Sequence, residues 1–184
     1  MPNEHDLSGR RVVLGVTGSI AAYKAVEFAS LLTKAGAEVR VILTDAAQQF
    51  VTALSFRSLT HQPVYNGLFV QTAAEPRHID LAESAEALCI VPATANCLAK
   101  LAHGLADDLL SCVAMATRAP ILLAPAMNDR MYTHPATQGN LTVLKERGVV
   151  FVGPEEGRLA SGKTGTGRMA APSRVFEALV GVLT

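Results

Sequence analysis

The chain repeats one local order: a short apolar run rich in β-branched residues, a polar loop of small residues, and a stretch with helical periodicity. In the first repeat, the run Arg11–Val16 leads through Gly18 into a helix that should end near Gly36, and a second strand is expected over residues 38–44. Short apolar runs of this kind are typical of strands buried on both faces of a parallel sheet. The order therefore predicts βαβ units with right-handed crossovers.

The rest of the chain continues the same alternation. Further strands are expected at residues 88–91, 120–124 and 149–152. We expect one helix through about Met115 after the strand at 88–91, and one helix to Arg147 after the strand at 120–124. After the strand at 149–152 we expect a glycine-rich loop and a last helix from about Pro172. The sequence thus predicts an α/β fold, a Rossmann-like doubly wound parallel sheet with helices on both faces, with an α+β fold as the alternative.

Three segments lie outside this alternation, although no shift in composition divides residues 1–184 into more than a single domain. Residues 1–10 are expected to form a polar tail. Residues 65–77 have little periodicity and contain an Asn-Gly pair, which predicts a loop. Residues 153–169 contain five glycines, which predicts a mobile flap.

Composition narrows the class of protein. The 16 basic and 16 acidic residues form no long run of one sign, which argues against nucleic acid or an anionic membrane as partner. No apolar stretch is long enough to span a bilayer, and the polar, acidic N-terminus does not resemble a secretory signal, so we expect a cytoplasmic protein. With 49% hydrophobic and only 17% charged residues, the chain should expose apolar surface that a homo-oligomer would cover.

The cysteines do not suggest a metal site or a disulfide framework. Cys89, Cys97 and Cys112 are odd in number and have no C-x-x-C spacing, which is typical of reduced, buried thiols. The histidines have no metal-ligand spacing either. We therefore expect no bound metal.

In open α/β sheets, ligands bind beyond the carboxyl ends of the strands. At the first such end, Gly18-Ser19-Ile20 can hold a phosphate through free backbone N–H groups and the Ser19 hydroxyl, although an ordinary helix cap is equally consistent with these residues. Thr44 stands at the end of the second strand, where a dinucleotide-binding protein carries Asp or Glu. A mononucleotide such as FMN therefore fits better than NAD.

A second candidate segment is Pro92-Ala93-Thr94-Ala95-Asn96. It offers backbone donors, a hydroxyl and a carboxamide around small side chains. That chemistry suits a flat heterocycle whose edges need hydrogen bonds and whose faces need room. Thr94 is also a candidate cap of the following helix, and the two roles are compatible.

Two further segments carry reactive or charged groups. His78 precedes Asp80 by two residues after the predicted loop, and a lone histidine in such a position is more often structural than catalytic. In the flap, Arg158, Lys163 and Arg168 lie among glycines and could grip an anionic ligand. The alternative for the flap is a solvated loop with scattered basic residues.

Taken together, these segments resemble the flavin-containing cysteine decarboxylases, from about residue 11 to the C-terminus. The resemblance rests on five motifs in the family's order: GVTGSIAAYK (15–24), HID (78–80), PATAN (92–96), PAMNDRMY (125–132) and ASGKTGTGRM (160–169). It implies a Rossmann-like fold with bound FMN. It also implies a homo-oligomer, either a trimer or a dodecamer of trimers, whose active site lies between subunits.

The resemblance also implies roles for individual residues. The cofactor FMN would contact, within the matching motifs, Gly18, Ser19, Ile20, Thr44, Pro92, Ala93, Thr94, Asn96 and Met127. His78 would be the catalytic histidine and Asn128 the asparagine that holds the substrate. Further substrate contacts would come from Met131, Ala160, Gly162, Lys163 and Arg168.

The implied reaction removes CO₂ from a cysteine carboxylate. Oxidation of the Cβ–S bond to a thioaldehyde, with hydride passing to the flavin, creates the electron sink that the carboxylate otherwise lacks, and His78 would assist deprotonation of the thiol. In the coenzyme A enzymes of the family a flap cysteine then supplies a proton, but this chain has Ser161 there. A hydroxyl is a far weaker acid than a thiol of pKa ~8.5, so either another group protonates the intermediate or the product leaves as an enethiol.

Three functions of this class remain open from the sequence. The substrate is expected to be a small phosphorylated thiol, 4′-phosphopantothenoylcysteine, which the cationic flap suits. The first alternative is the C-terminal cysteine of a peptide, left as an enethiol, which Ser161 favours. The second is a non-enzymatic FMN-binding regulatory subunit. A flavin prenyltransferase is disfavoured because His78-Ile79-Asp80 is not its signature.

Overall fold

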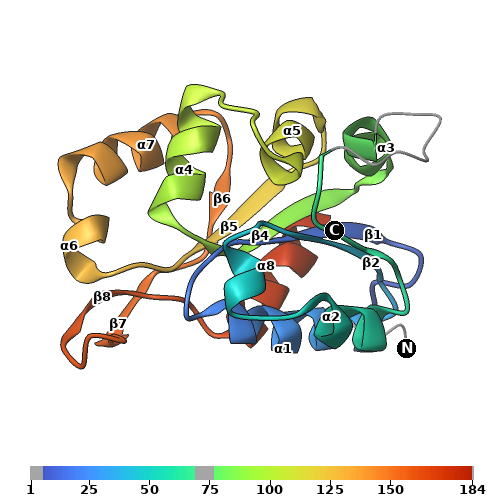
Figure 1. Ribbon diagram of the computed structural model, residues 1–184, viewed down its shortest axis with the longest axis horizontal. Coiled ribbons are helices and arrows are strands. Elements are labelled where there is room, and N and C mark those ends of the chain that lie inside the picture. Colours follow the sequence, from blue (N-terminus) through green and yellow to red (C-terminus); the bar gives the residue numbers. More distant parts are fainter. Residues whose placement is uncertain (1–5, 69–76, 184) are drawn as a thin grey trace.

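The computed structural model describes residues 6–68 and 77–183. Its centre is a six-stranded, fully parallel sheet of order β3-β2-β1-β4-β5-β6 (Figure 1). The strands are β1 (Arg11–Val16), β2 (Glu38–Leu43), β3 (Val64–Tyr65), β4 (Ala87–Ala93), β5 (Ile121–Pro125) and β6 (Val150–Phe151). The predicted parallel α/β sheet is confirmed, and each predicted strand overlaps an observed one.

Helices cover both faces of the sheet, as predicted (Figure 1). One face packs against α1 (Ala22–Lys34), α2 (Ala53–Thr60) and α8 (Pro172–Leu183), and the other against α3 (Arg77–Ser84), α4 (Ala95–His103), α5 (Leu109–Ala116) and α7 (Pro135–Glu146). The alternation of side chains along β1 divides the core, because Leu14 faces the first layer and Val13 the second. Residues 12–16 of the strand are therefore buried and apolar on both faces, and only Arg11 at its start is exposed.

Two predicted helices are each split in two, so the expectation of a continuous helix is wrong in both places. The first split lies between α4 and α5: Gly104 ends α4 in the left-handed region (φ 68°), and Asp108 begins α5 with a capping box to Ser111. The second lies between α6 (Asp129–Tyr132) and α7, where the His134 side chain caps a helix that begins at Pro135.

The glycine-rich segment contains regular structure that the sequence analysis did not predict. Strands β7 (Glu155–Arg158) and β8 (Thr164–Arg168) form an antiparallel hairpin. The hairpin packs against the loop after β5: the Met127 N–H donates to the Gly167 carbonyl at 3.0 Å, and a Cβ on Gly167 would collide with the Met127 carbonyl oxygen. Glycine at 167 is therefore required by close approach of two backbones.

Other segments were also not predicted in detail. A 3₁₀ turn, η1 (Ala47–Gln49), and helix α2 follow β2. The expected loop over 65–77 is bounded by β3 and α3, and its residues 69–76 lie outside the described part of the chain. Residues 1–5 of the expected tail also lie outside it, whereas Leu7 is buried and its N–H donates to the Ala35 carbonyl. Within residues 6–68 and 77–183, no helix is both long and apolar enough to cross a membrane.

The core of the first layer makes a testable prediction. Phe28 on α1 is fully buried, so Phe28→Ala should lower the free energy of unfolding by about 3–5 kcal/mol through lost burial and the cavity left behind. Urea denaturation followed by circular dichroism measures this loss. Met115→Ala, at an exposed position, should change stability by no more than about 0.5 kcal/mol, and equal effects of the two variants would contradict this packing.

Candidate functional site

A cavity of about 780 Å³ opens at the carboxyl ends of β1, β2, β4 and β5. From the adjacent central strands β1 and β4, the chain builds the sheet outward in opposite directions, through β2 and β3 on one side and through β5 and β6 on the other. The cavity therefore lies at the topological switch point, where α/β sheets bind ligands. Its volume lies within the range of small-molecule and cofactor sites. The lining comes from residues 17–19, 42–46, 66–68, 94–97, 100–101, 107–111, 126–127 and 131.

Thr17 holds the two central strands together at the mouth of the cavity. Its hydroxyl donates to the Pro92 carbonyl at 2.7 Å and accepts from the Thr94 N–H at 3.2 Å. The side chain is only 3% exposed, so neither bond competes with bulk water. Thr17 therefore fixes the loop after β1 relative to the loop after β4.

The loop after β1 forms one end of the cavity. The Ser19 hydroxyl accepts from the Ala21 N–H at 3.2 Å, just before α1 begins. A Cβ on Gly18 would collide with Ala46, so the absence of a side chain lets the loop after β2 pack directly over the loop after β1. Backbone N–H groups at the start of a helix, together with a hydroxyl, form a site suited to a phosphate.

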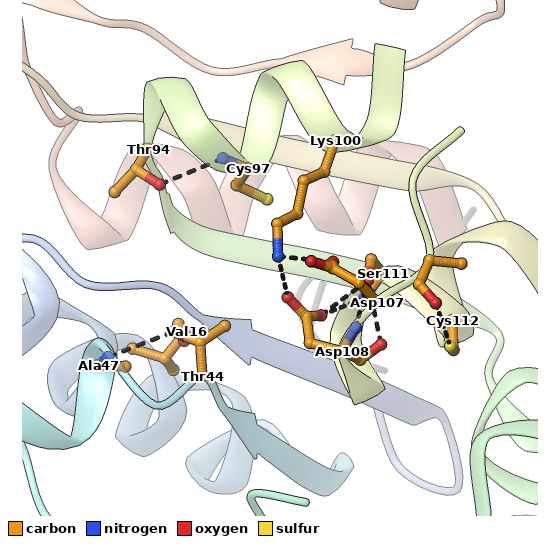
Figure 2. A network of polar contacts seen from close by, with 11 residues as sticks. Val16, Thr44, Ala47, Thr94, Cys97, Lys100, Asp107, Asp108, Ser111 and Cys112 are labelled. Carbon is orange, nitrogen blue, oxygen red and sulfur yellow. Dashed lines mark hydrogen bonds and ion pairs between the residues drawn. The ribbon is translucent and has the colours of Figure 1, made fainter. Parts of the chain in front are cut away.

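Thr44 keeps the loop after β2 in this position. Its hydroxyl donates to the Val16 carbonyl at 3.3 Å and accepts from the Ala47 N–H at 3.2 Å, which starts η1 (Figure 2). The side chain thus connects the ends of β1 and β2 at the cavity. A carboxylate at this position could not donate to the Val16 carbonyl.

The loop after β4 supplies a third wall. The Thr94 side chain caps α4 by accepting from the Cys97 N–H, so the predicted cap is confirmed (Figure 2). Asn96 is exposed toward the cavity in the first turn, and Cys97 is buried behind it. Burial raises the pKa of the Cys97 thiol to about 12, so the thiol stays neutral.

A polar cluster on the α4–α5 side of the cavity was missed by the sequence analysis. The Lys100 ammonium, on α4, pairs with Asp107 and Asp108 at 2.7 Å each (Figure 2). The hydrogen bonds that Lys100 donates to Asp107 and Asp108 raise the pKa of Lys100. Burial alone would raise the pKa of Asp108, but hydrogen bonds from Lys100 and Ser111 lower it overall. The Asp108-x-x-Ser111 spacing beyond Gly104 was the available sequence signal.

The cavity brings together seven of the predicted site residues: Gly18, Ser19, Thr44, Thr94, Asn96, Met127 and Met131. Pro92 and Ala93 are buried in β4 next to Thr94, and Ile20 is 62% exposed. Asn128 follows the lining residue Met127, and its side chain caps α6 through the Arg130 N–H.

The remaining predicted site residues lie in two separate places. His78 is in the first turn of α3, and Ala160, Ser161, Gly162 and Lys163 are exposed in the turn of the β7–β8 hairpin. Arg168, in β8, pairs with Glu155 at 3.1 Å. Figure 1 shows α3 and the hairpin at opposite ends of the long axis of the molecule. Within one copy of the chain, His78 does not meet the hairpin.

The Thr17 bonds give a prediction for stability. Thr17→Val keeps the shape of the side chain but leaves the Pro92 carbonyl and the Thr94 N–H without their partner, which should cost about 1–3 kcal/mol of unfolding free energy. Denaturant titration measures this cost. Thr142→Val is the matched control on an exposed helical position and should cost no more than about 0.5 kcal/mol. A Thr17 variant as stable as the control would contradict the assigned role.

Comparison with known proteins relates the whole chain to one family. The Flavoprotein family matches residues 1–184. The coenzyme A biosynthesis bifunctional protein CoaBC of Haemophilus influenzae is 48% identical over 174 residues, which cover 94% of this chain and 44% of that protein. The CoaBC protein of Bacillus subtilis is 45% identical, with 93% and 42% covered. The chain thus spans less than half the length of these relatives.

Solved structures extend the similarity to the fold. A cysteine-to-serine mutant of a PPC decarboxylase, complexed with pantothenoylaminoethenethiol, superposes with a TM-score of 0.82 at 35% identity, covering 92% of this chain and 96% of that one. The FMN-dependent cysteine decarboxylase SpaF superposes with a TM-score of 0.83 at 30% identity, covering 96% and 97%.

Proposed function

Because this chain belongs to the Flavoprotein family, we propose that it binds FMN and decarboxylates the cysteine carboxylate of 4′-phosphopantothenoylcysteine, giving 4′-phosphopantetheine. The observation that carries the proposal is the cavity at the switch point, which residues from three of the five family motifs line (15–24, 92–96 and 125–132). The relatives support it, since one is named for coenzyme A biosynthesis and another as a PPC decarboxylase. The chain is accordingly an enzyme, a carbon–carbon lyase.

The residues of the cavity fit FMN in size and in donor set. Gly18 and Ser19 at the start of α1 suit the phosphate, and Thr94 and Asn96 offer hydrogen bonds to the edge of a flat ring with Met127 beside it. Bound FMN supplies a two-electron acceptor next to the substrate. The protein supplies the position of the substrate and the movement of its protons.

Loss of CO₂ needs a place for the electron pair of the breaking C–C bond. Removal of a hydride from Cβ and a proton from the thiol gives a C=S bond, which accepts that pair as CO₂ leaves and becomes an enethiolate. His78 would take or direct the thiol proton. Asn128 would hold the carboxylate by hydrogen bonds without an ion pair that would stabilise its charge. Return of hydride and a proton then gives the thiol product, so the net reaction is redox-neutral.

The hairpin between β7 and β8 is proposed as the substrate flap. Arg158 and Lys163 are exposed there and suit a phosphorylated substrate. Arg168 forms an ion pair with Glu155, which also pairs with Arg174. The Arg168 charge therefore also helps to fix the base of the hairpin. Ala160 and Gly162 flank Ser161 in the turn, where a substrate could be covered, and Met131 contributes apolar surface from the cavity side.

A complete site on this proposal needs a second copy of the chain. Helix α3, with His78, and the hairpin, with Ser161, lie at opposite ends of one copy (Figure 1). Four large apolar side chains are exposed around the start of α1 and α2, namely Ile20, Tyr23, Phe50 and Leu54. A surface of this kind supports burial against another subunit. We therefore propose a homo-oligomer, either a trimer or a dodecamer of trimers.

We also assign the protein to the cytoplasm. Among the described residues, Cys89, Cys97 and Cys112 are all free, and Cys112 is half-buried rather than fully buried. Free thiols are typical of a reducing compartment. The assignment agrees with a role in coenzyme A synthesis, for which one relative is named.

The shared site predicts complementation between inactive subunits. His78→Asn and Asn128→Ala homo-oligomers should each keep bound flavin and lose at least about 100-fold in CO₂ release. Hetero-oligomers of the two variants, purified through two different affinity tags, should regain activity because some sites then combine an intact His78 with an intact Asn128. Mixed oligomers as inactive as their parents would contradict a site shared between copies.

A second candidate function follows from Ser161. The solved cysteine-to-serine mutant of a PPC decarboxylase is complexed with an enethiol, and the cysteine decarboxylase SpaF is 30% identical to this chain. A serine hydroxyl in the turn of the hairpin cannot protonate an enethiolate as a thiol does. The alternative is therefore oxidative decarboxylation, of a peptide C-terminal cysteine, with release of the enethiol.

Product analysis separates the two functions. The flavin-loaded protein is mixed anaerobically with 4′-phosphopantothenoylcysteine or with a cysteine-terminated peptide, and the product is weighed by mass spectrometry. The proposed reaction gives a product lighter by CO₂ alone and flavin that is oxidised at the end. A product lighter by CO₂ and two hydrogens, with reduced flavin, supports the alternative. Release of no CO₂ from either substrate would refute both.

The same assay tests the role of Ser161. If reprotonation is limiting, Ser161→Cys should shift the product from enethiol to thiol, and Ser161→Ala should not. Thr164→Ala, on the same hairpin, is the matched control and should leave the product ratio unchanged. An all-thiol product in both wild type and Ser161→Ala would contradict a role for Ser161 in limiting proton transfer.

A further inference from the structure

The charged side chains that line the cavity are unequal in sign. Among the lining residues that the structure describes, Asp45, Asp107 and Asp108 are acidic and Lys100 is the one cation. The Lys100 charge is paired with two of the acids, since its ammonium lies 2.7 Å from an oxygen of each of Asp107 and Asp108 (Figure 2). The lining therefore offers an anionic ligand no uncompensated positive charge.

Removal of the Lys100 charge would leave three carboxylates facing the cavity. A phosphate monoester carries a charge of about −1.5 to −2 at neutral pH. Charges around a partly enclosed cavity are screened less than charges on an open surface, so repulsion from Asp107 and Asp108 would reach a bound phosphorylated ligand. A ligand of the same shape without the phosphate would not meet this repulsion.

We propose that Lys100 is a specificity-determining residue, which offsets the negative charge of Asp107 and Asp108 so that the cavity accepts a phosphorylated flavin in preference to the unphosphorylated one. The inference rests on the proposed function in so far as it takes the ligand to be a flavin. The new claim is that the preference for FMN over riboflavin depends on the Lys100 charge, although Lys100 pairs with Asp107 and Asp108 and not with Gly18 or Ser19.

The acids themselves have a structural reason to be present. The Asp108 side chain accepts from the Ser111 N–H at 2.8 Å and begins α5, and Leu110 in the first turn of α5 packs over Gly15 of β1. Asp107 and Asp108 thus lie in the turn that seats α5 beside the cavity. Lys100 ties this turn to α4 and at the same time offsets one of the two negative charges of the turn.

The two effects of Lys100 can be separated by substitution. Lys100→Met removes both the tie and the charge. A triple variant, Lys100→Met with Asp107→Asn and Asp108→Asn, removes the tie and also removes both negative charges of the turn, and asparagine caps a helix about as well as aspartate. Lys100→Arg keeps both. Lys34→Met, at an exposed position in the last turn of α1, is the matched control.

The experiment titrates flavin-free protein with FMN and, separately, with riboflavin, following the quenching of flavin fluorescence at low and at high salt. In Lys100→Met the ratio of the riboflavin Kd to the FMN Kd should fall by about tenfold at low salt, and by less at about 1 M salt. Lys100→Arg should return the ratio to within about threefold of wild type, and the triple variant should return it at least to the wild-type value because its turn carries no negative charge. The control should match wild type.

Other results overturn the inference. A Lys100→Met variant that loses FMN and riboflavin affinity equally would make Lys100 merely structural, and one with an unchanged ratio would give it no role in selection. A triple variant with the same low ratio as Lys100→Met would also contradict the neutralisation. Failure of the wild-type protein to bind either flavin would instead refute the proposed function, so the two failures are distinguishable.

Discussion

The cavity depends on the buried Thr17 hydroxyl between the ends of β1 and β4. Strands at a switch point diverge in their connections, so nothing in the sheet ladder beyond Val16 fixes one loop relative to the other. A single side chain after β1 that both donates to the end of β4 and accepts from the loop after β4 supplies that constraint. Thr44 links the end of β2 to β1 in a related way, because its hydroxyl donates to the Val16 carbonyl. Two threonines thus hold the strand ends around the site in place.

The sequence was informative wherever strand ends carry the site. Parallel strands place their carboxyl ends on one edge of the sheet, so residues that follow different strands can be assigned to one site from the sequence. The cavity lining includes four such residues: Gly18, Thr44, Thr94 and Met127. Helix breaks were harder, because apolar periodicity continues across them. Gly104 and the Asp108 capping box interrupt a segment whose side chains are apolar on both sides of the break. The Lys100 cluster was missed for this reason, since a continuous helix would not turn Asp108 back toward Lys100.

The hairpin and His78 show two other limits of sequence reasoning. In residues 164–168 glycine alternates with polar residues, so the segment lacks the β-branched, apolar pattern that predicts a strand; its pairing is stabilised instead by backbone contact with Met127 and by the Glu155 ion pairs. His78 was found by motif alone. Its position on α3, away from the hairpin, depends on the fold, which the motif alone does not describe.

The electrostatics of the cavity follow from how it holds an anion. In the proposed site, backbone N–H groups near Gly18 and the Ser19 hydroxyl would bind a phosphate through dipoles, which are weaker at long range than a full positive charge. Such a cradle tolerates little opposing charge nearby. The turn that seats α5 requires an acidic or amide cap at Asp108, and Asp107 adds a second carboxylate beside it. A lysine paired with both acids reconciles the structural need of the turn with the electrostatic need of the ligand, and it does so without placing a free cation where it would compete with the cradle for the phosphate.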